Sequence, residues 1–122
     1  MANAPKILVV DDIPRNRRIL RDRLESRGCA VLEAGDGEEA LVMVQREMPD
    51  VVFLDIIMPG MDGYAVLENL KADDELRHIP VIVVSAVDQI QSVARCLELG
   101  AEDYLSKPFN AAVLEARLGS SL

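Results

Sequence analysis

The chain has 122 residues, half of them apolar, and its 13 basic and 21 acidic side chains give a net charge of −8. This length fits one domain, and the apolar fraction is sufficient for a full core. The negative balance disfavours a nucleic-acid or anionic-membrane binder, because either partner would repel the chain at long range. It suits a site that binds a divalent cation.

Neither a membrane span nor a secretion signal is visible in the sequence, because its apolar runs are far too short. Two cysteines, Cys29 and Cys96, match neither a disulfide framework nor a metal-binding pattern. We expect reduced thiols in a cytoplasmic protein. A redox pair is the alternative, but nothing beside either cysteine would activate a thiol.

Short apolar runs alternate with amphipathic stretches five times along the chain. The runs are too short for helices and rich in branched side chains, which favours strands buried on both faces. The predicted strands cover residues 6–11, 29–34, 50–55, 80–85 and 102–106. Helical spacing of apolar residues predicts a helix after each strand.

The predicted helices carry start or stop signals. Pro14 suits the first turn of the first helix, and Gly28 suits its end. Residues 63–72 form the third predicted helix and residues 88–99 the fourth, while Asn110 is placed to cap the fifth. The apolar residues expected to face the sheet are Ile13, Leu20 and Leu24; Ala40, Leu41, Val44 and Met48; Val66, Leu67 and Leu70; and Ile90, Val93, Ala94 and Leu97.

Strands that alternate with helices predict βα units and a parallel sheet. Right-handed crossovers then give a doubly wound α/β domain of three layers, with helices on both faces of the sheet. In such folds ligands bind outside the carboxyl ends of the strands. The residues that follow the strands are therefore the candidates for chemistry.

Those residues include three carboxylates, a hydroxyl and an amine. Asp11 and Asp12 end the first strand, Asp55 the third, Ser85 the fourth and Lys107 the fifth. Three carboxylates in one crevice repel one another unless a cation neutralises them, and an all-oxygen site is what Mg²⁺ accepts. A carboxylate beside Mg²⁺, with a hydroxyl and an ammonium opposite, could bind and receive a phosphoryl group.

Each of these residues also has a purely structural interpretation. An Asp after a strand is most often a helix cap, which is the commoner role for Asp12 considered alone. Ser85 could close a turn, and Lys107 could be a solvated loop charge. No P-loop pattern occurs, which excludes nucleotide cleavage by that route. Three other acids are interpreted as helix caps: Asp36, Asp62 and Asp88.

Four motifs remain when the chain is considered as a whole: residues 9–12 (Val-Val-Asp-Asp), residues 55–63 (Asp-Ile-Ile-Met-Pro-Gly-Met-Asp-Gly), Ser85-Ala86 and Lys107-Pro108. In this order and spacing they resemble the receiver domain of bacterial two-component response regulators. The resemblance covers essentially the whole chain, and the loop of residues 55–63 is its most specific part. It implies a flavodoxin-like fold, with five parallel strands in the order 2-1-3-4-5 and five helices.

The resemblance also implies a role for each site residue. Asp55 would accept a phosphoryl group from a histidine kinase or a phosphotransfer protein. Asp12, Asp55 and the Ile57 carbonyl would bind Mg²⁺ directly, and Asp11 would act through a metal-bound water. Lys107 would contact the phosphoryl oxygens.

Phosphorylation is expected to change a distant face of a domain like this one. The resemblance implies that Ser85 moves toward the phosphoryl group and that Tyr104 rotates inward behind it. The face formed by the fourth helix, fifth strand and fifth helix would then dimerise or bind an output partner. The structural alternative for Tyr104 is a half-buried aromatic residue on an edge strand. The Lys107–Pro108 bond would be cis.

Two further expectations concern partner and lifetime. Ile57 and Val87 occupy the positions that flank the phosphoryl group in similar receivers; both are branched and apolar, so slow hydrolysis is expected. The first helix would dock the phosphodonor, the alternative being a solvated face with pairs such as Arg18/Asp22 and Arg21/Glu25. Its six basic residues are Arg15, Arg17, Arg18, Arg21, Arg23 and Arg27.

An enzyme that forms an aspartyl phosphate and turns over an external substrate is the second hypothesis. Such enzymes usually need a second acid and an inserted cap, but Ile56 and Ile57 follow Asp55 and every connection is short. A flavin binder of the same fold would need a phosphate loop after the first strand. We therefore expect a switch rather than an enzyme. The short segment after the fifth strand favours a receiver, residues 1–122, excised from a longer protein whose output could be a nucleotide cyclase or another signalling domain.

Overall fold

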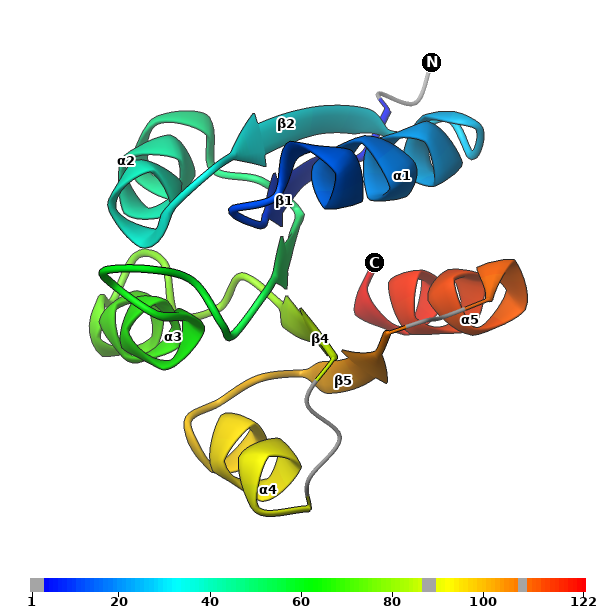
Figure 1. Cartoon of the computed structure of the whole chain (residues 1–122). Helices are drawn as coiled ribbons and strands as arrows, with labels where there is room; N and C mark the ends of the chain where they lie inside the picture. The colour runs from blue at the N-terminus through cyan, green and yellow to red at the C-terminus, as the bar shows by residue number, and fades with distance from the viewer. Residues whose placement is uncertain (1–3, 87–89, 108–109) are drawn as a thin grey trace.

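The computed structural model describes residues 4–86, 90–107 and 110–122 (Figure 1). The strands are β1 (Lys6–Val10), β2 (Ala30–Ala34), β3 (Val51–Leu54), β4 (Val81–Ser85) and β5 (Asp103–Ser106). The helices are α1 (Pro14–Glu25), α2 (Gly37–Glu47), α3 (Gly63–Ala72), α4 (Ile90–Glu98) and α5 (Ala111–Ser121). Every predicted strand and helix is present, and the differences lie at the ends.

The strands form one parallel sheet in the order β2-β1-β3-β4-β5, which confirms the doubly wound, flavodoxin-like topology. β1 lies between β2 and β3, with Val10 in register with Ala34 on one side and with Leu54 on the other. Helices α1 and α5 cover one face of the sheet, and α2, α3 and α4 cover the other (Figure 1). The domain therefore has the expected three layers.

Two apolar cores lie on the two faces of the sheet, because alternate residues of a strand point to opposite sides. On β1, Leu8 and Val10 belong to the core under α2, α3 and α4, whereas Ile7 and Val9 belong to the core under α1 and α5. β3 and β4 follow the same alternation and are fully buried. Strands buried on both faces explain the continuous apolar runs in the sequence.

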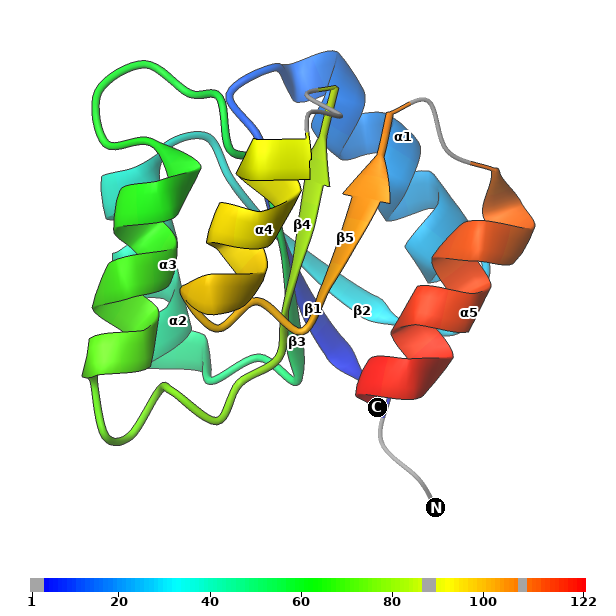
Figure 2. The same ribbon diagram turned by 90° about the horizontal axis from the view of Figure 1, so that it is seen from below.

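The sheet has a carboxyl edge, where the strands end, and an amino edge, where they begin. Figure 2 shows that β1 begins and α5 ends at the amino edge, opposite the ends of the strands. The exposed His78 also lies near this edge, two residues before Pro80 and β4. In the described part of the chain, no helix has the length and apolar character needed to cross a membrane.

The predicted caps and thiols agree with the structure where it describes them. Asp36 accepts a hydrogen bond from the N–H of Glu39, Asp62 from that of Ala65, and Asn110 from that of Val113, at 2.8–3.0 Å; Asp88 lies outside the described residues. The two cysteines are free and buried, and burial raises the pKa of both thiols, Cys29 and Cys96, which disfavours a redox pair.

Four apolar residues predicted to face the sheet are exposed instead. Ile13 is the residue before α1 and is 49% exposed, and Met48 ends α2 in a left-handed backbone conformation with φ 47°. Both lie outside the regular helix, so the helical spacing does not direct their side chains. On α4, Cys96 is fully buried, whereas Ala94 is exposed and Leu97 is 48% exposed. The buried side of α4 is therefore centred one residue earlier than the apolar spacing indicated.

Candidate functional site

The candidate site forms where the two central strands end. Asp11 follows β1 and Asp55 follows β3, and β1 and β3 are neighbours in the sheet. The N–H of Asp11 donates to the carbonyl of Ala34 at 3.2 Å, and the N–H of Asp55 donates to the carbonyl of Val10 at 2.9 Å. Both acids are thus the first residues beyond the strand ladder, and the sheet itself positions their backbones.

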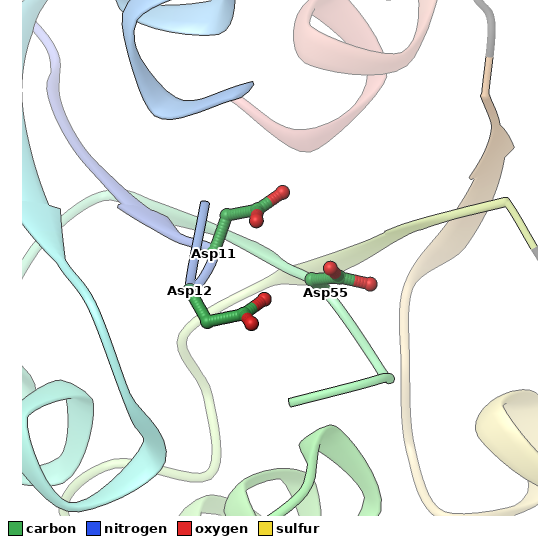
Figure 3. Close-up of side chains that lie close together, drawn as sticks. All are labelled: Asp11, Asp12 and Asp55. Carbon is green, nitrogen blue, oxygen red and sulfur yellow. The ribbon is translucent and has the colours of Figure 1, made fainter. Parts of the chain in front are cut away.

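Three carboxylates gather at this edge. Asp11, Asp12 and Asp55 each offer a carboxylate oxygen, and these oxygens all lie within 4.8 Å of one another. Figure 3 shows the three side chains close together at this edge. Asp11 and Asp55 are buried and Asp12 is half-buried, so water screens their mutual repulsion only in part. We call these three residues the acidic cluster.

Lys107 neutralises only part of the acidic cluster. Its Nζ lies 2.7 Å from Oδ2 of Asp11 and 3.5 Å from Oδ2 of Asp55. Burial raises the pKa of the Asp55 carboxyl, and the charge of Asp11 raises it further, while Lys107 and the N–H of Ile57 lower it. One ammonium against three carboxylates leaves negative charge that a cation would stabilise. Hard oxygen ligands of this kind fit Mg²⁺.

Asp12 is not the cap of α1. The residue at that position is Ile13, and no side chain accepts a hydrogen bond from the first turn of the helix. The N–H of Ile13 donates instead to Oδ1 of Asp11 at 2.9 Å, in a local turn that fixes the Asp11 side chain. The structural interpretation of Asp12 is therefore wrong, and its carboxylate is available to the acidic cluster.

The loop after Asp55 explains why its sequence is so specific. The N–H of Gly63 donates to the carbonyl of Ile56 at 2.8 Å. A Cβ at Gly63 would lie 2.4 Å from the carbonyl oxygen of Asp55 and 2.6 Å from Cα of Ile56. Only glycine lets the first turn of α3 lie this close to the Asp55 backbone. Gly60 supplies the left-handed turn of the loop, with φ 74°.

The other predicted site residues lie around the acidic cluster or behind it. Ser85 is fully buried at the end of β4, and its carbonyl accepts a hydrogen bond from the N–H of Lys107 at 2.8 Å. Tyr104 is half-buried in β5 and packs against the core under α2, α3 and α4. Ile57 is 60% exposed, and its N–H lies 3.3 Å from Oδ1 of Asp55. Val87 and Pro108 lie outside the described residues, so neither the flanking position nor the cis bond can be described.

Sequence reasoning missed one contact at this edge. Nη1 of Arg17 donates to the carbonyl of Asp11 at 2.6 Å, and both Arg17 and Arg21 pair with Glu33 of β2. Of the two pairs expected on this helix, Arg21/Glu25 is present at 3.7 Å, whereas Asp22 pairs with Arg21 at 3.8 Å in place of Arg18. A charged residue inside a strand that packs under an arginine-rich helix was the signal that could have indicated these contacts.

A parallel α/β domain with clustered acids and a lysine at the carboxyl edge of its sheet is the arrangement that the resemblance to receiver domains implies. The family model of the response regulator receiver domain matches residues 7–119, and the chain belongs to this family. This confirms the resemblance.

Curated relatives with a similar sequence are longer proteins. The chain is 45% identical over 115 residues to the response regulator PleD of Caulobacter vibrioides, covering 94% of this chain and 25% of that protein. It is 47% identical over 120 residues to a probable transcriptional regulator, ycf27, of Cyanophora paradoxa, covering 98% of this chain and 49% of that protein. The chain thus spans half or less of the length of these relatives.

Solved structures with the same fold are also receivers. The signal receiver domain of a histidine kinase from Syntrophus aciditrophicus is 36% identical, with a TM-score of 0.90, covering 98% of this chain and 90% of that one. The chemotaxis protein CheY4 of Vibrio cholerae is 28% identical, with a TM-score of 0.91, covering 98% and 99%. Receivers with very different sequences therefore share this arrangement of strands and helices.

Proposed function

We propose that the chain is a phosphorylation-controlled switch in which Asp55 accepts a phosphoryl group from a histidine kinase or a histidine phosphotransfer protein. The observation that carries this proposal is a buried carboxylate, Asp55, placed with two further acids and a lysine at the ends of the central strands. Membership of the receiver family supports the same chemistry.

In the transfer step, a carboxylate oxygen of Asp55 attacks the phosphorus of phosphohistidine. A P–O bond forms as the P–N bond breaks, and the donor imidazole leaves. Lys107, which lies between Asp11 and Asp55, is close enough to contact the incoming phosphoryl oxygens. Asp12, Asp55 and the Ile57 carbonyl would bind Mg²⁺ directly and Asp11 through a metal-bound water, and the cation would neutralise charge on the phosphoryl oxygens.

The conformational effect of phosphorylation would be transmitted from Asp55 to β5. Ser85 lies at the end of β4, and its carbonyl is bound to the N–H of Lys107. Contacts from Ser85 and Lys107 to the phosphoryl group exist only in the phosphorylated state, so they shift the equilibrium toward it. We infer that Tyr104 rotates inward and that the face formed by α4, β5 and α5 then dimerises or binds an output partner. Sedimentation with and without beryllofluoride tests this: an unchanged mass and an unchanged Tyr104 environment would contradict it.

The phosphodonor would dock on α1. Arg17 and Arg21 are paired with Glu33, and Arg27 with Glu115, so these three serve the fold. Arg15 and Arg18 are exposed on the same helix. We expect charge reversal at Arg15 and Arg18 to slow transfer from the cognate partner and to spare labelling by a small phosphodonor. Equal loss with both donors would contradict docking on this helix.

The phosphorylated form would hydrolyse slowly. The side chain of Ile57 is apolar and largely exposed beside Asp55, so it cannot orient a water molecule by hydrogen bonding. Val87 is the second such residue in the sequence. We expect the double variant Ile57→Asn, Val87→Glu to lose phosphate about 10- to 100-fold faster than the parent. An unchanged rate of phosphate loss would mean that Ile57 and Val87 contribute only packing at the edge of the site.

We further propose that residues 1–122 are the receiver of a longer cytoplasmic protein and turn over no external substrate themselves. The greater length of PleD and ycf27 supports an attached output domain, which could be enzymatic or, as the name of ycf27 suggests for that protein, transcriptional. With a net charge of −8, we expect this chain itself to contact neither nucleic acid nor membrane.

The decisive experiment is labelling of Asp55→Asn with a small phosphodonor such as phosphoramidate. This substitution removes the nucleophile and nearly preserves its shape. We expect the parent to take up one base-labile phosphoryl group per chain in the presence of Mg²⁺, and the variant to take up none. Stoichiometric labelling of the variant would show that Asp55 is not the acceptor.

A further inference from the structure

The carbonyl of Asp11 carries a contact that the proposed phosphoryl transfer does not use. It accepts a hydrogen bond from Nη1 of Arg17 at 2.6 Å. This carbonyl belongs to the peptide that joins Asp11 to Asp12, two members of the acidic cluster. Because a peptide unit is planar, fixing its oxygen also fixes the direction in which the chain enters Asp12.

Asp12 depends on this peptide more than its neighbours do. Oδ1 of Asp11 accepts from the N–H of Ile13, and its Oδ2 from Lys107; Oδ1 of Asp55 accepts from the N–H of Ile57. Across residues 4–86, 90–107 and 110–122, no donor is hydrogen-bonded to the Asp12 carboxylate. The direction of the Asp12 side chain is therefore set by its backbone.

Arg17 is itself fixed in place from β2. Its Nε lies 3.3 Å from Oε1 of Glu33, and Oε2 of Glu33 accepts from Nη1 of Arg21 at 2.7 Å. Glu33 is in register with Val9, two residues before Asp11. A planar guanidinium can point Nε at a carboxylate and Nη1 at a carbonyl at the same time, whereas a lysine ammonium is a single point charge.

We propose that Arg17 is a positioning residue for the metal site. The ion pair with Glu33 fixes the Arg17 guanidinium. The guanidinium in turn holds the Asp11–Asp12 peptide so that the Asp12 carboxylate faces Asp55. This inference rests on the proposed Mg²⁺-dependent function. Electrostatics alone predicts the opposite sign for a variant without this arginine, because a nearby positive charge weakens binding of a cation.

The test compares Mg²⁺ binding in Arg17→Met, Arg17→Lys and the parent 122-residue chain. Calorimetry or amide chemical shifts give the dissociation constant, and labelling by phosphoramidate gives the Mg²⁺ concentration for half-maximal rate. We expect both variants to bind Mg²⁺ about 10-fold more weakly, as is typical when a residue that orients a metal ligand is removed. The labelling rate at saturating Mg²⁺ should match that of the parent, because Asp55 and Lys107 are untouched.

Arg23→Met is the matched control. Arg23 is exposed on the same helix and has no proposed role in docking, so its loss changes the charge of α1 equally and should leave Mg²⁺ affinity unchanged. Unchanged or tighter Mg²⁺ binding by Arg17→Met would overturn the proposal. If Arg17→Met does not fold, Arg17→Lys and Glu33→Gln decide in its place, and parent-like affinity in both would overturn the proposal. A parent chain that binds no Mg²⁺ would instead contradict the proposed function, and this inference with it.

Discussion

Two lysines at opposite edges of the sheet have very different surroundings. At the amino edge, Nζ of Lys71 donates to the carbonyls of Arg77 and Ile79, both at 2.9 Å. Burial lowers the pKa of Lys71, and the charge of Glu102 counteracts part of this effect. At the carboxyl edge, Lys107 meets two carboxylates, those of Asp11 and Asp55.

The difference separates a contact whose partners are neutral from one that leaves negative charge uncompensated. Lys71 satisfies two neutral carbonyls and closes the turn between α3 and β4, so its partners need nothing more. Lys107 carries one positive charge beside three carboxylates, so the carboxyl edge retains net negative charge that a cation would stabilise. A fold can therefore use the same residue type to stabilise one edge and to prepare the other for a ligand.

Exchanging Lys107 for methionine gives the largest expected effect. Lys107→Met removes the ammonium that we propose to contact the phosphoryl oxygens, and loss of one such contact costs about 100-fold in rate, or about 2.7 kcal/mol. The measurement is labelling by phosphoramidate at saturating Mg²⁺. Lys71→Met, at the other edge, should label at the parental rate. Equal labelling rates in Lys107→Met and Lys71→Met would show that the lysine at the carboxyl edge has no special role in phosphorylation.

The same substitution at Lys71 should act on stability. Lys71→Met leaves the carbonyls of Arg77 and Ile79 without their donor, and we expect the free energy of unfolding to fall by about 2 kcal/mol. Urea unfolding monitored by circular dichroism measures the change. Parental stability in this variant would show that water replaces the ammonium without cost.

Mg²⁺ should stabilise the folded chain by neutralising the acidic cluster at the carboxyl edge. At a free concentration ten times the dissociation constant, the gain in unfolding free energy is about 1.4 kcal/mol. Urea unfolding with Mg²⁺ and with EDTA measures it. Asp12→Asn, which removes one candidate ligand, should lose most of the gain. A gain of the same size in that variant would place the cation elsewhere.

The smallest effect concerns pH. Because the pKa of Asp55 is raised in the folded chain, the folded state binds this proton more tightly than the unfolded state does. The unfolding free energy therefore falls as the pH rises from the unfolded to the raised folded pKa, and the full penalty applies above it. In EDTA, Asp55→Asn should be more stable than the parent at neutral pH, with no advantage below the unfolded pKa. Urea unfolding at several pH values measures this difference, and an advantage independent of pH would contradict it.

Much of the fold followed from local pattern. Strands buried on both faces produce uninterrupted apolar runs, and strands alternating with helices predict a doubly wound parallel sheet. The strand order came from the resemblance to receivers, and the sheet confirms it. The meeting of Asp11, Asp12 and Asp55 follows from the topology, because neighbouring parallel strands end at one edge.

The errors arose where side-chain direction depends on tertiary packing. Leu97 fits a helical apolar stripe as well as Cys96 does, and only the position of α4 on the sheet decides between them. The contact of Arg17 with the Asp11 carbonyl requires α1 to lie at one particular position along β1 and β2. No periodicity in the sequence encodes that position.

The position of the two ends of the fold has a practical consequence. β1 begins and α5 ends at the amino edge, across the sheet from the acidic cluster (Figure 2). A chain anchored to a surface or joined to a fluorescent reporter through Leu122 would therefore hold Asp55 on the side away from the attachment. Tethered copies of this chain should consequently keep the proposed acceptor site accessible without an added spacer.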